Sequence, residues 1–161
     1  MIKLAEISDK HKDSLVKLLN NENVSKWLLH VPFPYSPKDA EEFIEKCRYN
    51  KVDHLFAIEN DGVHIGGIGI HIKGEHKAEI GYWLGEEYWR KGYLTIALNK
   101  VIDYAFKDLN LKRIYAGTFE DNIASERLLL KCGFEYEGTL RKSLKKDDVF
   151  FNEKIFSRIA D

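Results

Sequence analysis

Apolar residues recur along this chain with two different spacings, which predict strands and helices in alternation. Apolar and polar positions alternate at every second residue in a strand, whereas the apolar positions of a helix recur about every 3.6 residues. The first spacing occurs at residues 2–6, 55–59, 63–72, 78–84, 113–118, 134–144 and 149–159. Asn60-Asp61-Gly62 is a hairpin turn signal that joins the second of these segments to the third.

Helical spacing follows residues that are favoured at helix starts. Ser8-Asp9 and Ser36 precede two such segments, and Pro37 suits the first turn of the second. The predicted helices run from Ser8-Asp9 through Leu19, near 24–29, from 37 toward Cys47, over 95–109 and over 122–132, where Gly133 ends the last. The prolines within residues 30–35 exclude regular structure there. The pattern therefore predicts a mixed α/β fold.

Length and charge exclude several classes of protein. With 161 residues and 44% hydrophobic content, the chain is predicted to form one domain over residues 1–161. Its 25 basic and 26 acidic residues give a net charge of −1, which supplies no broad attraction to nucleic acid or to an anionic membrane. No apolar run approaches the roughly 18 to 20 residues of a membrane span, and the first residues lack a secretion signal. We expect a cytoplasmic protein in which Cys47 and Cys132 are reduced.

A basic turn between a strand and a helix is the first candidate site. The strand ends at Leu84-Gly85, the turn Trp89-Arg90-Lys91-Gly92 follows, and an amphipathic helix is predicted from Thr95. Unpaired amides at a helix start attract anions, and glycine lets a ligand approach the backbone closely. Arg90 and Lys91 add positive charge. The turn therefore predicts a phosphate site, although many such turns serve folding alone.

A second strand end lies nearby in this plan. Residues 118–125, from Thr118 to Ser125, connect the next predicted strand to the next predicted helix. Ligands collect at such strand ends in open sheets. Asn122 and Ser125 are also residue types that cap helices, so this segment allows both a structural and a ligand-binding interpretation.

Several stretches, taken in order, resemble the GCN5-related N-acetyltransferases, and specifically their ribosomal-protein alanine N-acetyltransferase branch. They are AEIGYWL, YWRKGYLTIAL, KRIYAGT, Asn122-x-x-Ser125, LLLKCGF and EGTLR. The family's cofactor loop reads Gln/Arg-x-x-Gly-x-Gly/Ala, and Trp89, Gly92 and Leu94 hold those places here. Tryptophan is usual at the first place in this branch, whereas Leu94 replaces a small residue and Ile96 replaces a common glutamate.

The resemblance implies an acyl-CoA N-acyltransferase fold. Its mixed, mostly antiparallel sheet of six to seven strands, flanked by helices, would splay between the strands at 78–84 and 113–118. The pantetheine of acetyl-CoA would lie in the gap beside the backbone of Tyr82, Trp83 and Leu84, as an added strand would. The remaining implied cofactor-binding residues are Trp89, Arg90, Lys91, Gly92, Tyr93, Leu94, Thr95, Asn122 and Ser125.

The resemblance also implies roles in transfer of an acetyl group from a thioester to an amine. Glu79 is the expected base, alone or through a water, and Glu120 is the reserve; the alternative is that Glu79 pairs with Lys77, Lys112 or Arg113. Many family members protonate the leaving thiolate from a tyrosine, whose place Leu129 holds here. Ser125 takes over that role in the ribosomal-protein branch.

The acceptor is the least determined part of this interpretation. We expect a protein amino terminus; a small amine such as a polyamine, amino sugar or amino-acid derivative is the nearest alternative, and a non-catalytic acyl-CoA-binding module is a different class. The apolar stretch 27–33 walls the acceptor site in the resembling family, or simply packs a helix. The six histidines lack metal-ligand spacing, so no metal is assigned. A homodimer through the final hairpin is possible by family habit.

Overall fold

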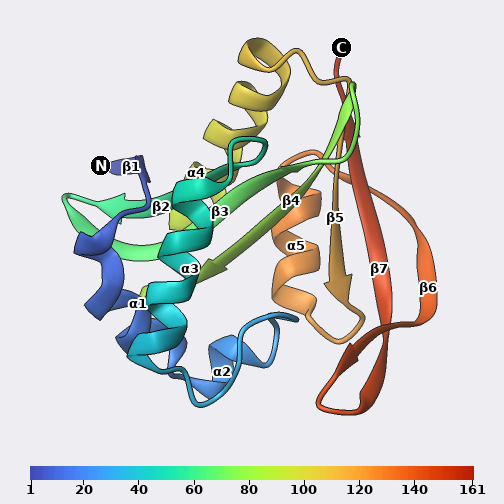
Figure 1. The fold of residues 1–161 in the computed structure, drawn as a ribbon. Coiled ribbons are helices and arrows are strands. Elements are labelled where there is room, and N and C mark those ends of the chain that lie inside the picture. The colour runs from blue at the N-terminus through green and yellow to red at the C-terminus, as the bar shows by residue number, and fades with distance from the viewer.

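In the computed structural model, which describes residues 1–161, all strands join one seven-stranded sheet (Figure 1). Its order is β1-β2-β3-β4-β5-β7-β6, and every neighbouring pair is antiparallel except β4 and β5. The strands are β1 (Ile2–Glu6), β2 (His54–Asn60), β3 (Val63–Ile72), β4 (Lys77–Leu84), β5 (Arg113–Phe119), β6 (Glu135–Lys146) and β7 (Val149–Ile159). The predicted fold class and all predicted strands are confirmed, with ends that move by two residues at most.

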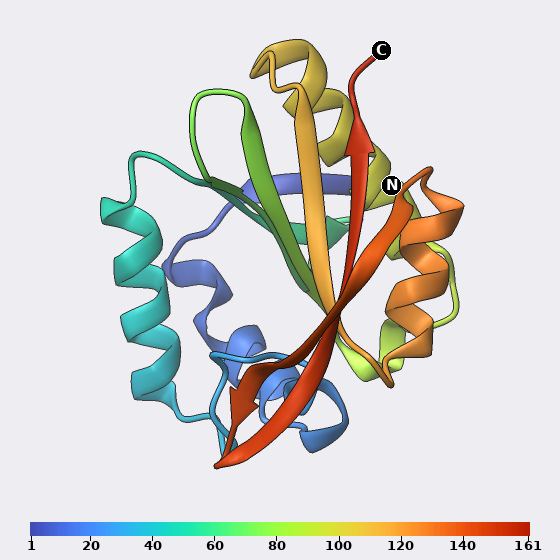
Figure 2. The ribbon, with the colours of Figure 1, turned by 90° about the vertical axis from the view of Figure 1, so that its right-hand side faces the viewer.

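Helices cover both faces of this sheet (Figure 2). They are α1 (Lys12–Leu19), α2 (Glu22–Ser25), α3 (Pro37–Tyr49), α4 (Tyr93–Asp103) and α5 (Ile123–Lys131), with short 3-10 turns at Asp9–His11 and Glu86–Tyr88. The main core lies between the sheet and α4 and α5, where Leu98, Ile114 and Phe156 are fully buried. A smaller core joins α1, α2 and α3. None of these helices combines the length and the apolar character that crossing a bilayer requires.

Two predicted helices differ from the observed ones. The helix expected near 24–29 is α2, which begins earlier because the Asn21 side chain accepts a hydrogen bond from the Asn23 amide and caps it. The helix expected over 95–109 begins two residues sooner, directly after Gly92, and continues beyond Asp103 as a π-helical turn over Tyr104–Asp108. The start moves because Tyr93 and Leu94 pack against the main core.

The parallel contact between β4 and β5 is short. It comprises three residue pairs, Lys77 with Arg113, Ala78 with Ile114 and Glu79 with Tyr115. Beyond them β4 stays paired with β3 as far as Leu84, and β5 stays paired with β7 as far as Phe119. The two strands therefore start together and diverge toward their ends, as Figure 1 shows. This is the splay expected between segments 78–84 and 113–118.

A capping box at the start of α3 gives a direct test of local stability. The Ser36 hydroxyl accepts from the Asp39 amide at 3.1 Å, and the Asp39 carboxylate accepts from the Ser36 amide at 2.8 Å. We expect Ser36→Ala to lower the free energy of unfolding by about 1 kcal/mol, measured by urea denaturation. Ser36→Thr keeps a hydroxyl and serves as the control. Equal stability of the alanine variant and the parent would contradict the role of this cap.

Candidate active site

The β4 side of the gap presents free backbone groups. The Gly85 amide donates toward β3, to the Ile65 carbonyl at 2.8 Å. Because peptide groups alternate in direction along a strand, those of Tyr82 and Leu84 point away from β3 and into the gap. The Leu84 carbonyl accepts a hydrogen bond from the Trp89 indole N–H at 2.8 Å. One of the backbone groups that was expected to bind pantetheine therefore already has a partner within the chain. An extended ligand can still pair with the rest of this edge as an additional strand.

At the wide end of the gap, the turn before α4 presents a series of amides. None of the backbone N–H groups of residues 90–95 donates to a backbone carbonyl; the first to do so is that of Ile96, to Gly92. Arg90 and Gly92 have positive φ angles of 63° and 79°. A turn of this kind at a helix start directs successive N–H groups to one side and favours an anion. The predicted phosphate cradle at Arg90 to Thr95 therefore has the donors that a pyrophosphate requires.

The unusual residues of this turn point away from the cradle or hold it in place. The Leu94 side chain packs against the main core, so it does not cover the amides. Ile96 is half exposed on the helix surface. The Trp89 indole is tied to the end of β4, which fixes where the turn begins. Trp89 thus positions the cradle, and its N–H is not free for the cofactor.

On the α5 face of the gap, a tyrosine and a serine share a hydrogen bond. Tyr82 on β4 contacts Ser125 on α5 through their hydroxyl oxygens. The Asn122 side chain accepts from the Ser125 amide at 3.3 Å and caps the helix, so the structural interpretation of Asn122 holds. Burial raises the pKa of Tyr82, and the bond to Ser125 opposes this only in part, so the phenol keeps its proton.

Leu129 lies fully buried in the main core. The residue at the place of the family's tyrosine is therefore a packing residue here. Tyr82, which approaches Ser125 from β4 rather than from the helix, is a second hydroxyl that the motif comparison did not single out.

The opposite face of the gap carries acidic and aromatic side chains. Glu79 and Tyr115 are the last residue pair before the strands part. Burial and the negative charge of Glu79 raise the pKa of Tyr115, and Glu153 adds to this effect. Glu79 is paired with Tyr115 across the two strands, and Glu153 acts on the same hydroxyl through its charge from β7. Continuing the register, Gly81 and Gly117 face each other next, and neither contributes a side chain of its own to the gap.

Glu153 on β7 packs against the β5 backbone. A side chain at Gly117 would collide with the Glu153 carboxylate. The Ser143 hydroxyl donates to the other oxygen of that carboxylate at 2.9 Å. Glu153 is thus a second acid beside the predicted base Glu79. Glu120, the predicted reserve base, is exposed, and its carboxylate accepts a hydrogen bond from the Asn152 side-chain amide at 3.0 Å.

The predicted ion pairs of Glu79 are not observed. Arg113 instead makes a forked contact with Glu137 at 2.9 and 2.7 Å. This contact, with a hydrogen bond from Ser157, lowers the pKa of Glu137 to about 2. No ion pair of Glu79 with Lys77 or Lys112 is present. The Glu79 carboxylate is therefore available for chemistry.

Aromatic residues border the acidic face at its wide end. The Phe119 ring lies 6.0 Å from that of Trp27 and 5.2 Å from that of Phe151. The Lys146 ammonium, at the tip of the final hairpin, donates to the carbonyls of Ser25, Leu28 and Val31. These bonds hold this stretch near the end of β5, and Leu28 and Val31 pack against the smaller core. That stretch 27–33 walls the acceptor site stays a prediction.

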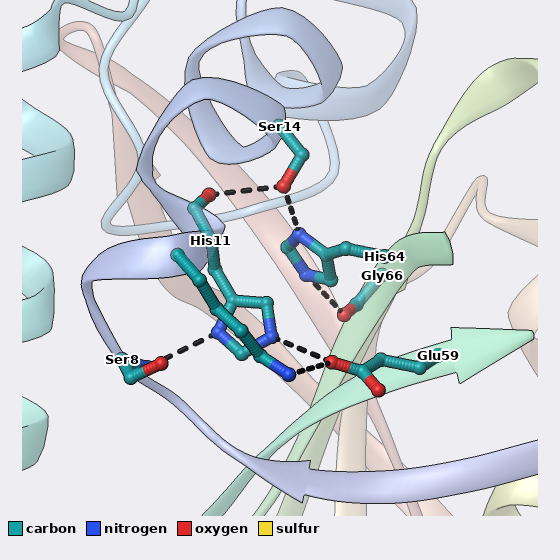
Figure 3. A network of polar contacts seen from close by, with 7 residues as sticks. Ser8, His11, Ser14, Glu59, His64 and Gly66 are labelled. Atoms are coloured by element: carbon teal, nitrogen blue, oxygen red, sulfur yellow. Dashed lines mark hydrogen bonds and ion pairs between the residues drawn. The ribbon is translucent and has the colours of Figure 1, made fainter. Parts of the chain in front are cut away.

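A second polar network lies outside the gap, between the 3-10 turn Asp9–His11, α1 and the β2–β3 hairpin (Figure 3). His11, almost fully buried, accepts from the Ser8 amide and contacts Glu59 at 2.9 Å, while His64 contacts Ser14 and the Gly66 carbonyl. Burial lowers the pKa of His64 to about 4. The network borders a cavity of about 290 Å³. Each ring nitrogen of the two histidines has a partner within the chain. No cluster of His, Cys, Asp or Glu in the chain could hold a metal ion.

Comparison with protein families shows which family this chain belongs to. A model described as "Acetyltransferase (GNAT) domain" matches residues 2–135. The chain belongs to the GNAT acetyltransferase family. It is 42% identical to the uncharacterized N-acetyltransferase YoaA of Bacillus subtilis over 96% of this chain and 90% of that protein. The ribosomal-protein-serine acetyltransferase of Escherichia coli is 32% identical to this chain, over 99% of this chain and 93% of that protein.

A small-molecule enzyme is also among the relatives of this GNAT protein. The spermidine N(1)-acetyltransferase of Vibrio cholerae is 29% identical over 76% of this chain and 72% of that protein. Among solved structures, the microcin C7 self-immunity acetyltransferase MccE in complex with acetyl-CoA and AMP has a TM-score of 0.90 and 28% identity, over 99% of this chain and 92% of that one. The GNAT family uses acetyl-CoA, so the predicted enzyme class and cosubstrate are confirmed.

Sequence reasoning missed three residues of this GNAT site. Tyr115 is paired with Glu79, Glu153 lies against Gly117, and the continued register places Thr118 opposite Tyr82. Alternation along β5 would have shown that Tyr115 and Gly117 share a face. The approach of Glu153 depends on the pairing of β7 with β5, which no local pattern reveals.

A glycine comparison tests the cradle. Gly92 and Gly62 both have positive φ, 79° and 83°, and both have open space where a side chain would stand. We expect Gly92→Ala to weaken acetyl-CoA binding about tenfold, or about 1.4 kcal/mol, because its methyl group would stand between the amides and the pyrophosphate. Gly62→Ala, in the β2–β3 turn, introduces the same backbone strain and should leave the Kd from calorimetry unchanged. Equal Kd values for both variants would argue against the cradle.

Proposed function

We propose that this acetyltransferase moves an acetyl group from acetyl-CoA to the α-amine of a protein amino terminus, by direct attack on the thioester. The observation that supports it most is the gap itself. It has unpaired amides for a pyrophosphate at its wide end and the carboxylates of Glu79 and Glu153 near the point where the strands part. Acetyl-CoA supplies an activated acyl group, and the chain supplies positioning, a base and hydroxyl donors.

The type of amine decides how much help the base must give. An amine attacks only without its proton. A lysine amine with a pKa of about 10.4 needs roughly 4.6 kcal/mol to be neutral at pH 7, whereas a terminal amine near 8 needs about 1.4 kcal/mol. A single carboxylate, acting directly or through a water, is sufficient for the second case.

In this proposal Glu79 is the base. It lies at the closed end of the gap without an ion-pair partner, because Arg113 is engaged by Glu137. The Tyr115 hydroxyl beside it can orient the amine or the water that carries the proton. Gly81 leaves room for the attacking nitrogen on this face, and the Glu153 carboxylate lies over Gly117 across the gap.

Ser125 is the proposed donor to the leaving sulfur. The Tyr82 phenol keeps its proton and can donate it to the Ser125 oxygen, which leaves the Ser125 O–H free to point toward the thioester. The leaving thiol has a pKa of about 8.5, so modest assistance is enough.

Direct attack is supported by the state of the two thiols. Burial raises the pKa of Cys47 to about 11 and also raises that of Cys132. Neither thiol is therefore readily ionised, and a thiolate is the form that would carry an acetyl group. An acetyl-enzyme intermediate on cysteine is disfavoured.

The E. coli relative named for ribosomal-protein serine matches nearly the whole chain, which favours a protein amino terminus. A small polyamine is the second candidate, because carboxylates and aromatic rings together suit a polycation and a spermidine acetyltransferase is a relative. A homodimer and a cytoplasmic location stay predictions. The final hairpin, expected to form the dimer contact, exposes Tyr136, Leu140, Val149 and Phe150.

The base assignment is tested by Glu79→Gln. We expect a rate at least tenfold lower at pH 7 and a pH–rate profile shifted to higher pH, because the amine must then lose its proton without help from the carboxylate. The pKa of Tyr115, followed by ultraviolet absorbance, should fall when the neighbouring charge is removed. Glu120→Gln is the matched control and should leave both unchanged. If the pH–rate profile is unaltered in Glu79→Gln but shifted in Glu153→Gln, Glu153 rather than Glu79 is the base.

The acceptor is tested by a panel in which thiol release is measured. It contains short peptides with free amino-terminal Ser, Ala or Met, the same peptides with a blocked amino terminus and an internal lysine, and spermidine. We expect kcat/KM to be highest for free amino termini. A preference of tenfold or more for spermidine would replace the proposed acceptor with a small amine.

A further inference from the structure

A third hydroxyl-bearing residue flanks the gap on its α5 face. The register of β4 and β5 ends at Glu79 and Tyr115, and its continuation places Thr118 opposite Tyr82. Alternation along the strands places both residues on the face of Ile80 and Ala116, which belong to the main core. This is the face on which Tyr82 contacts Ser125 of α5.

Thr118 has a property that no other residue of the chain shares. It is 5% exposed, and its Oγ1 is the one buried side-chain polar atom without a hydrogen-bond partner. A buried hydroxyl without a partner destabilises a fold, and a valine of the same shape would avoid this penalty. In the ligand-free chain this hydroxyl is closed off from solvent, and the continued register places Thr118 beside the gap, so the partner that we assign to it is a ligand bound there.

We infer that Thr118 is an additional catalytic residue whose hydroxyl donates a hydrogen bond to the sulfur of acetyl-CoA as the acetyl group leaves. The inference rests on the proposed acetyl transfer. When the amine nitrogen attacks, a C–N bond forms, the C–S bond breaks, and its electron pair goes to the sulfur. The proton lost by the amine goes to the base. Thr118 transfers no proton; it stabilises the negative charge that develops on sulfur.

The sulfur is a better partner for Thr118 than the pantetheine amides are. Those amides can pair with the free backbone groups of β4, as a strand would. The sulfur has no backbone partner of this kind, and a thiolate accepts several hydrogen bonds. Ser125 and Thr118, on α5 and β5, can then approach it from two elements, with Tyr82 holding Ser125 in place.

Two substitutions separate a catalytic hydroxyl from a packing residue. Thr118→Val keeps the shape and removes the hydroxyl, and we expect kcat to fall about ten- to hundredfold, as for loss of a hydrogen bond to a charged group. Its unfolding midpoint should stay the same or rise, because no bond within the protein is lost. Thr118→Ser should restore most of kcat. Thr139→Val, on β6, is the control and should leave kcat unchanged.

A binding experiment identifies the atom that Thr118 contacts. Calorimetry compares coenzyme A with desulfo-coenzyme A, which lacks the sulfur, between pH 7 and 10. In the parent protein, the ratio of the two affinities should rise as the bound thiol ionises. In Thr118→Val that rise should be reduced, while desulfo-coenzyme A binds as before.

The remaining outcomes overturn the inference or fall outside it. If Thr118→Val weakens both ligands equally, the hydroxyl binds the pantetheine chain rather than the sulfur. If affinity, pH dependence and kcat all match the parent, the hydroxyl has no role in the site. Failure of the parent to acetylate any amine would refute the proposed function alone, because the binding comparison needs no acceptor.

Discussion

The separation of β4 from β5 after three residue pairs is the constraint on which the rest of the site depends. Each strand is held by its outer neighbour, β4 by β3 and β5 by β7, so the sheet is two antiparallel halves joined along a short seam. A strand edge left unpaired inside a protein is unfavourable unless something pairs with it. The cosubstrate of a GNAT enzyme can pair with this edge. Binding of the cosubstrate then satisfies backbone groups that the fold leaves without hydrogen-bond partners.

The same separation divides the chemistry between two faces. Because side chains alternate along a strand, Tyr82 faces α5 while Gly81 and Trp83 face the other side. The α5 face gathers hydroxyls, which suit a leaving sulfur, and the opposite face gathers carboxylates, which suit an incoming amine. The acyl carbon would lie between them, in the plane of the sheet. The division follows from strand alternation and the register alone.

The cradle residues illustrate what could be predicted from local pattern. Gly92, the basic pair before it and the amphipathic helix after it lie within a few residues, and such a turn has the same geometry in many folds. Leu94 shows the limit of motif comparison. It departs from the family's small residue, yet its side chain packs into the core and leaves the amides uncovered. The direction of a side chain depends on what the helix packs against, which the motif does not contain.

The sequence by itself determined the order and kind of the elements, the anion-binding turn, and Glu79, Asn122 and Ser125 as residues near two strand ends. These depend on periodicity, capping and turn chemistry, which act over a few residues. Only the tertiary structure decided that Arg113 is engaged by Glu137, that Glu153 lies against Gly117, and that the Thr118 hydroxyl is buried without a partner. Each of these depends on pairing between strands that are distant along the chain, and the hydrophobic pattern of either strand carries no information about that pairing.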